Sequence, residues 1–320
     1  MSNAHSVHIP VMGIAYTIDT PLKVAPYGLD SVISLVDDIL LERMRKMYCN
    51  EYDIPYDDIL ETEDDFRALR IPAYLNLIDL LVQRKFENIK ASAFGDAREV
   101  FKYISLLKDG KNLKLEFQNI LDEKAIPDIV NSWLTENLCK GSIDVNIMTK
   151  VDKTNYKGEE KLPAMFNDAH AVLRGYAMST LESSVILSAG INPRLYSYIQ
   201  EFEDFYPNEQ GVIKKKIILK VSDYRSAFVP GRFLAKKGLW VSEYRVESGL
   251  NCGGHAFATN GLLLGPALDD FNSKREELTR SMNEDLLASL RQKNRAIPEV
   301  PMALRVAARG GVGTSQEHSF

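Results

Sequence analysis

The chain has 320 residues, of which 45% are hydrophobic and 26% charged, and its formal net charge is −5 at pH 7. This length suffices for one large barrel or two medium domains, and the ordinary apolar content predicts a soluble globular protein with a sizeable core. Because a negative net charge offers no overall basic field to nucleic acid or anionic lipid, we expect neither as a partner.

The cysteines and the hydropathy pattern indicate the compartment. Cys49, Cys139 and Cys252 are the three cysteines of the sequence. They have no CxxC spacing, so neither a disulfide framework nor a tetrahedral zinc site is predicted. No apolar run reaches the roughly 18 residues that span a bilayer, and the polar start MSNAHSVH lacks the features of a signal peptide. We therefore expect a cytoplasmic protein with no membrane partner.

The first 140 residues predict one strand followed by helices. Residues 9–16, IPVMGIAY, are typical of a short buried strand, and a loop then leads to a helix N-cap at Asp30 or Ser31. Apolar residues recur at steps of three and four through residues 31–140, which predicts a mainly helical block. We interpret residues 1–30 as the first strand and loop of a barrel, and the helical block as an insertion or cap subdomain.

Residues 141–320 have a different pattern. Five short β-rich runs, SIDVNIMTK, ESSVILSAGI, KKKIILKV, LWVSEYRV and MALRVAA, alternate there with turn residues and helical patterns. This alternation is typical of βα units that form a parallel sheet, with ligand-binding loops at the carboxyl ends of the strands. The predicted fold is therefore α/β, with TIM-barrel-like βα repeats and a large helical insertion.

The run NCGGHAFATN places a glycine pair directly before a histidine, between a strand signal and a helix signal. Gly253 and Gly254 allow a ligand to approach the backbone closely, and His255 can carry or take a proton near neutral pH. A structural histidine and nucleophilic catalysis by the nearby Cys252 are the alternatives. Since no pair of histidines has metal-ligand spacing, we predict no metal site.

Two further polar residues lie at predicted strand ends. Lys220 ends the run IILK, and if a flavin were bound its ammonium could stabilise the negative charge at the N1 and C2 carbonyl edge of the reduced ring. Asn146, in DVNIMTK, offers an amide that suits the hydrogen-bonding edge of a heterocycle. The alternatives are a lysine that reaches solvent or pairs with Asp223, and an asparagine that caps a turn.

A glycine-rich loop follows the last predicted strand in ARGGVGTSQE. Gly310, Gly311 and Gly313 expose backbone N–H groups, and Thr314 or Ser315 could cap the helix expected next. Backbone amides at a helix N-terminus attract anions, so the loop predicts a phosphate cradle. A flexible turn is the alternative.

Taken in order, these segments resemble the FMN-dependent TIM barrels of the nitronate monooxygenase (2-nitropropane dioxygenase) family. The matching segments are IPVMGIAY, DVNIM, VILSAGINP, IILKVSD, LWVSEYRVESGLNCGGHAF and ALRVAARGGVGT, within residues 9–28 and 141–316. The resemblance implies an FMN-dependent oxidoreductase that oxidises a small carbon acid, such as a nitronate, while O₂ reoxidises the flavin. It also implies residue roles: catalytic His255, and cofactor-binding Asn146, Lys220, Gly253, Gly254, Gly310, Gly311, Gly313 and Thr314.

In that family an eighth βα unit follows the glycine loop, whereas this chain ends at Phe320. We therefore expect either a fragment that lacks the final unit or a barrel that closes in another way. The alternative functions are another FMN barrel enzyme, such as an enoyl reductase or a glutamate-synthase-like module, and a non-catalytic barrel that binds a phosphate ligand. The sequence predicts no oligomeric state.

Overall fold

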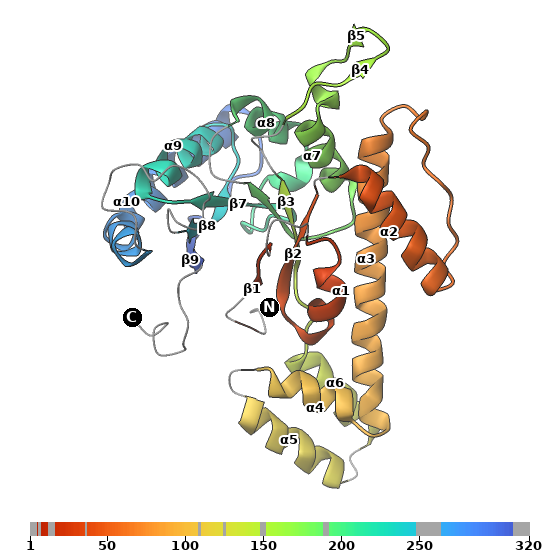
Figure 1. Ribbon diagram of the computed structural model, residues 1–320. Coiled ribbons are helices and arrows are strands. Elements are labelled where there is room, and N and C mark those ends of the chain that lie inside the picture. Colours follow the sequence, from red (N-terminus) through yellow and green to blue (C-terminus); the bar gives the residue numbers. More distant parts are fainter. Residues whose placement is uncertain are drawn as a thin grey trace. The chain divides into compact units, whose positions relative to one another are not determined.

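The structure is a computed structural model, which describes residues 5, 8–11, 17–35, 37–107, 110–123, 126–147, 152–187, 192–247 and 264–309. The chain divides into two compact units (Figure 1). Unit 1 comprises Met1–Val145 and Ser179–Leu181, and unit 2 comprises Asn146–Met178 and Glu182–Phe320. Each unit combines helices with strands, so the predicted α/β class is confirmed.

Unit 1 is mainly helical. It contains β1 (His8–Ile9), α1 (Thr20–Val24), the 3₁₀ turn η1 (Ala25–Tyr27), β2 (Asp30–Ser34), α2 (Asp38–Glu51), α3 (Phe66–Ala91), η2 (Ser92–Phe94), α4 (Arg98–Ser105), α5 (Gly110–Asp122), α6 (Pro127–Asn137) and the start of β3 (Ile143–Ile147). Its strand order is β1-β2-β3, and β1 and β2 run parallel. The chain passes from unit 1 to unit 2 within β3, between Val145 and Asn146.

Strand β2 corrects the predicted start of the first long helix. Residues 30–34 were expected to cap and begin that helix, but they form a largely buried strand. Helix α2 begins only at Asp38, where the Asp37 carboxylate accepts hydrogen bonds from the backbone N–H groups of Ile39 and Leu40. The apolar run SVISLV suits a short buried strand as well as a helix, and periodicity cannot distinguish the two.

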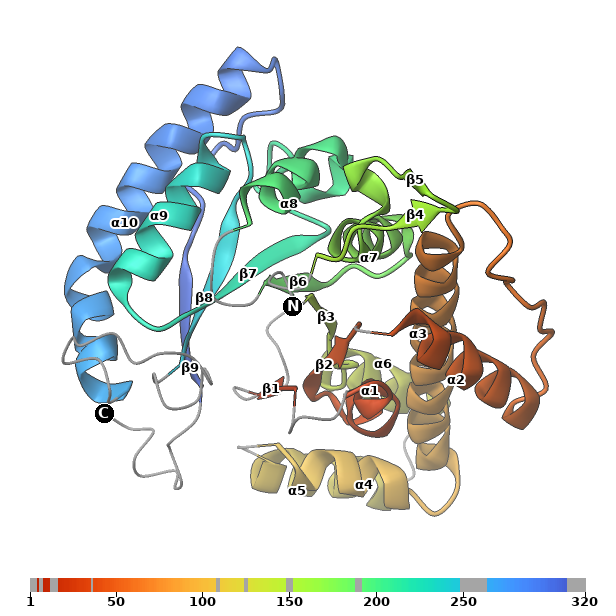
Figure 2. The same ribbon diagram turned by 45° about the horizontal axis from the view of Figure 1, so that its top comes forward.

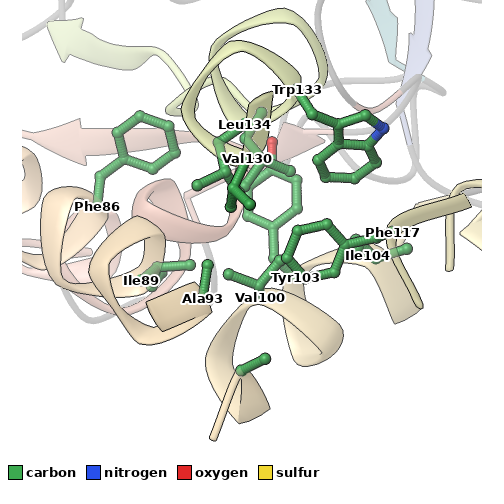
Figure 3. Packing of buried hydrophobic residues seen from close by; sticks show 12 residues of the cluster. Phe86, Ile89, Ala93, Val100, Tyr103, Ile104, Phe117, Val130, Trp133 and Leu134 are labelled. Carbon is green, nitrogen blue, oxygen red and sulfur yellow. The ribbon is translucent and has the colours of Figure 1, made fainter. Parts of the chain in front are cut away.

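The end of α3 and helices α4 to α6 enclose a core of their own (Figure 3). Aromatic rings form its centre, with the ring centroids of Phe117 and Trp133 4.7 Å apart and those of Phe101 and Phe117 5.5 Å apart. The Trp133 indole N–H also donates to Glu116 Oε1 at 2.9 Å. Because this tryptophan is 5% exposed, its fluorescence can report the folding of unit 1.

Unit 2 contains the βα repeats. Its elements are the end of β3, β4 (Tyr156–Lys157), β5 (Glu160–Lys161), η3 (Ala164–Phe166), α7 (Asp168–Met178), β6 (Ser184–Leu187), α8 (Pro193–Tyr198), η4 (Ile199–Glu201), η5 (Glu203–Phe205), β7 (Lys216–Val221), α9 (Tyr224–Ala235), β8 (Val241–Glu247), α10 (Leu264–Gln292) and β9 (Arg305–Arg309). The strand order is β3-β6-β7-β8-β9, and the pairs from β6 to β9 are all parallel. Helices α9 and α10 run side by side along β7, β8 and β9 (Figure 2). The five predicted β-rich runs thus correspond to β3, β6, β7, β8 and β9.

One face of β8 is apolar and packs against α9 and α10. Tyr244 is completely buried there, and its hydroxyl donates to the Ala227 carbonyl at 3.3 Å. Its ring centroid lies 6.2 Å from that of Phe271 on α10. Side chains alternate between the two faces of a strand, so the residues on either side of Tyr244 point away from these helices.

Lys215, directly before β7, is a buried cation within unit 2. It is 1% exposed, and its ammonium lies 4.7 Å from the centroid of the Tyr176 ring. Burial lowers the pKa of Lys215 to about 8, although the charges of Asp204 and Glu182 act in the opposite direction. The folded chain therefore binds a proton at this residue less tightly than the unfolded chain does.

This difference predicts a pH-dependent stability. Between the folded pKa of about 8 and the ordinary lysine pKa of 10.5 the unfolded chain holds more protons, so raising the pH favours folding. We expect this one group to add roughly 2 kcal/mol to the free energy of unfolding between about pH 7 and about pH 9.5. Lys215→Met should lose that gain, whereas Lys214→Met, at the 62% exposed neighbour, should keep it. Urea unfolding at several pH values measures both, and parallel pH profiles of wild type and Lys215→Met would contradict the prediction.

Candidate functional site

The carboxyl ends of the parallel strands of unit 2 form the candidate site. In the ladder, Lys220 of β7 is in register with Arg245 of β8, and Arg245 with Ala307 of β9. Residues in register on parallel strands point to the same face of the sheet. The sequence-predicted Lys220 therefore shares a face with Arg245 near the edge at which ligands bind in α/β proteins.

This face of β8 carries charges that are buried. Glu243, Arg245 and Glu247 alternate with the apolar-face residues Tyr244 and Val246, and the three charged residues are only 4–6% exposed. Buried charges are costly unless they are paired, so their pairing determines the geometry of the site.

Glu243 is the centre of one set of pairs. Arg245 Nε donates to Glu243 Oε1 at 2.5 Å, and Arg305 Nε of β9 lies 3.3 Å from Glu243 Oε2. Each carboxylate oxygen thus faces a different guanidinium. The side chain of Arg305 is 54% exposed, whereas those of Glu243 and Arg245 are 8% and 6% exposed. The Glu243–Arg245 pair therefore belongs to the interior, and Arg305 reaches it from the solvent.

Lys220 lies beside Glu247 at the end of β8. Its Nζ is 3.9 Å from Glu247 Oε1, and the two side chains are 17% and 5% exposed. The predicted alternative partner, Asp223, instead caps α9 by accepting from the Ser226 backbone N–H at 2.7 Å. Lys220 is consequently a largely buried ammonium held at a strand end.

Asn146 lies in β3 and is 5% exposed. Along the strand it alternates with the buried Val145 and Ile147. Strand β6 lies between β3 and β7 in the sheet order, so Asn146 and Lys220 are on next-nearest strands. Asn146 and Lys220 thus lie near the carboxyl ends of two strands of one sheet, as the sequence predicted.

The remaining candidates lie outside the described residues. These are His255, Gly253, Gly254, Gly310, Gly311, Gly313 and Thr314, together with Cys252. In sequence they follow β8, which ends at Glu247, and β9, which ends at Arg309, and these two strands are parallel neighbours. Their predicted roles stay predictions.

A histidine that the sequence analysis left aside has a carboxylate partner. His170, on α7, is 3% exposed, and its Nδ1 lies 3.0 Å from Asp152 Oδ2, without hydrogen-bond alignment. The other oxygen, Asp152 Oδ1, accepts from the Ala169 backbone N–H at 3.1 Å, and the Tyr198 ring centroid lies 5.2 Å from the His170 ring. These contacts anchor the start of α7. Because 18 residues separate His170 from Asp152, no local sequence motif revealed the pair.

Among the described residues, no group of three or more His, Cys, Asp or Glu side chains is placed to hold a metal ion. None of the described helices combines the length and the apolar character needed to cross a membrane.

Comparison with known proteins gives no assignment. The sequence matches no protein-family model and no curated protein. A function for this chain must therefore be argued from its own residues.

Proposed function

We propose that this chain is an FMN-dependent oxidoreductase with a TIM-barrel-like fold, similar to the nitronate monooxygenases, and that the flavin binds at the carboxyl ends of the unit 2 strands. The observation that supports it is the largely buried ammonium of Lys220 at the end of β7. A fixed positive charge at such an edge stabilises an anionic reduced flavin.

The described residues fit such a cofactor. Lys220 supplies the positive charge, and Glu247 at 3.9 Å restrains its ammonium. Asn146 contributes an amide that can donate and accept at the flavin edge. Within this proposal His255 handles the substrate proton, and the run from Gly310 to Thr314 holds the phosphate. The flavin would take electrons from a small carbon acid and pass them to O₂.

Purified protein tests the proposal directly. We expect bound FMN to give absorbance at about 450 nm, which is a property of the oxidised flavin itself. In the absence of oxygen, propane-2-nitronate should reduce the flavin and abolish this absorbance. Protein that is colourless and takes up no added FMN would contradict the proposal and leave a non-catalytic barrel. Flavin that binds but is reduced only by NADH or NADPH would indicate another FMN barrel enzyme instead.

Lys220→Met should separate catalysis from binding. Removing one preorganised group that stabilises developing charge typically slows an enzyme about 100-fold or more. We therefore expect flavin reduction to slow by about that factor and the midpoint potential of the bound flavin to fall, while the protein still binds FMN. Stopped-flow absorbance and a redox titration measure the two effects.

The matched control is Lys236→Met, at an exposed lysine just after α9 in the same unit. This variant should keep the wild-type rate and potential. If Lys220→Met also kept the wild-type rate of flavin reduction and the wild-type midpoint potential, Lys220 would not interact with the flavin.

A further inference from the structure

Unit 1 contains a pocket of its own, separate from the candidate site. It has a volume of about 420 Å³ and is formed by α1, η1, α3 and α4. Leu22, Pro26 and Ile89 provide apolar surface in it, and all three are buried residues. Small-molecule sites typically combine such apolar surface with a few convergent polar groups.

Three lysines line the same pocket: Lys23, Lys85 and Lys102. The lining carboxylate, Glu99, already has partners, because Tyr27 donates its hydroxyl hydrogen to it at 2.5 Å and Lys102 Nζ lies 3.7 Å away. Lys102 also donates to the Tyr27 hydroxyl oxygen at 2.7 Å, and this hydrogen bond raises the pKa of Lys102. Lys102 therefore stays protonated and neutralises Glu99.

In the part of the chain that the structure describes, no carboxylate pairs with Lys85, whose Nζ lies 5.8 Å from the centroid of the Tyr52 ring. Its ammonium donates a long hydrogen bond of 3.4 Å to the Leu22 carbonyl. The side-chain amide of Asn88, one turn along α3, has no hydrogen-bond partner among the described residues either. Among the described residues Lys23 forms an ion pair with Asp19 at 3.0 Å, and because the lysine is 69% exposed this pair contributes little. The pocket thus has donors available and a net positive charge.

We propose that this pocket of unit 1 binds a small organic phosphate, whose phosphate group contacts Lys85 and Lys102 and whose carbon skeleton lies against Leu22 and Ile89. A dianion with three terminal oxygens suits a pocket lined by more than one ammonium group, since charge-assisted hydrogen bonds are the strong ones. The apolar surface distinguishes such a ligand from free phosphate. This site goes beyond the proposed function and lies in the other unit of the chain.

Phenyl phosphate is a suitable probe, with inorganic phosphate and phenol as its separate halves. In the 320-residue chain with labelled isoleucine methyl groups, Ile89 can be assigned through Ile89→Val and then followed by NMR. We expect phenyl phosphate to shift the Ile89 methyl resonance with a dissociation constant on the order of 1 mM or below, and each half alone to bind at least about tenfold more weakly.

Variants locate the contact. Lys85→Met and Lys102→Met should each weaken phenyl phosphate binding about tenfold, and Lys85→Arg should restore part of it. Lys46→Met, at an exposed lysine of α2 outside the pocket, should bind like wild type. Trp133 fluorescence checks that each variant is folded.

Lys220→Met distinguishes this pocket from the proposed flavin site. This variant should leave the shift of the Ile89 methyl resonance by phenyl phosphate unchanged, whether or not FMN binds. An Ile89 resonance that does not move at about 10 mM phenyl phosphate would overturn the inference. So would wild-type affinity for phenyl phosphate in both Lys85→Met and Lys102→Met, or an Ile89 response that disappears in Lys220→Met.

Discussion

Glu243→Gln is expected to lower the free energy of unfolding by about 3–5 kcal/mol, because breaking a buried ion pair by removing the charge of one partner is strongly destabilising. The substitution keeps the size of the side chain and removes only its charge. Arg245 then loses the carboxylate at 2.5 Å while it remains 6% exposed, and Arg305 loses the oxygen at 3.3 Å. Urea unfolding followed through the buried Trp240 of unit 2 measures the loss, with Trp133→Phe as background so that one tryptophan reports.

A double substitution provides the control for this prediction. Buried ion pairs can often be replaced by apolar residues of similar volume at little cost, so Glu243→Met combined with Arg245→Met should recover most of the stability. Arg305→Met alone should cost less than about 1 kcal/mol, because that side chain is 54% exposed. A Glu243→Gln variant as stable as wild type would mean that the pair is not desolvated.

The sequence was most informative about the strands of unit 2. Runs such as KKKIILKV and LWVSEYRV are rich in β-branched residues and bounded by turn residues, and they correspond to β7 and β8. It was wrong at β2, because the run SVISLV, with four apolar residues among six, satisfies both the helical and the strand periodicity. Whether the strands close into a barrel stays a prediction.

The candidate site could be predicted only in part. Lys220 and Asn146 were found because each ends a strand, a local property that a sequence displays. Glu247 was missed because its proximity to Lys220 depends on the parallel register of β7 and β8. The sequence nevertheless contained a signal for this pair. In VSEYRVE charged residues alternate with apolar ones, in a strand that was expected inside a parallel sheet. Both faces of such a strand are usually buried, so its charged side chains should be paired.

Gly141→Ala should unfold unit 1 or lower its free energy of unfolding by about 3 kcal/mol or more, which is at or above the upper end of ordinary overpacking. A Cβ at Gly141 would lie 2.1 Å from the carbonyl oxygen of Leu29 and 2.3 Å from its carbonyl carbon. These are backbone atoms, so no side-chain rotation can relieve the overlap. Hydrogen bonds hold the two segments together, from Gly141 N–H to the Ala25 carbonyl at 2.8 Å and from Ser31 N–H to the Ser142 carbonyl at 3.0 Å.

Trp133, with Trp240→Phe as background, reports this loss through urea unfolding. The matched control is Gly265→Ala in α10 of unit 2, where a Cβ meets nothing within 4 Å and the helix should be unaffected or slightly more stable. This control is followed through Trp240, with Trp133→Phe as background. The expected contrast is therefore a large loss at Gly141 and none at Gly265. Gly141→Ala with wild-type stability would show that β2 and β3 do not approach this closely, and the strand pairing that corrects the predicted helix start would then be wrong as well.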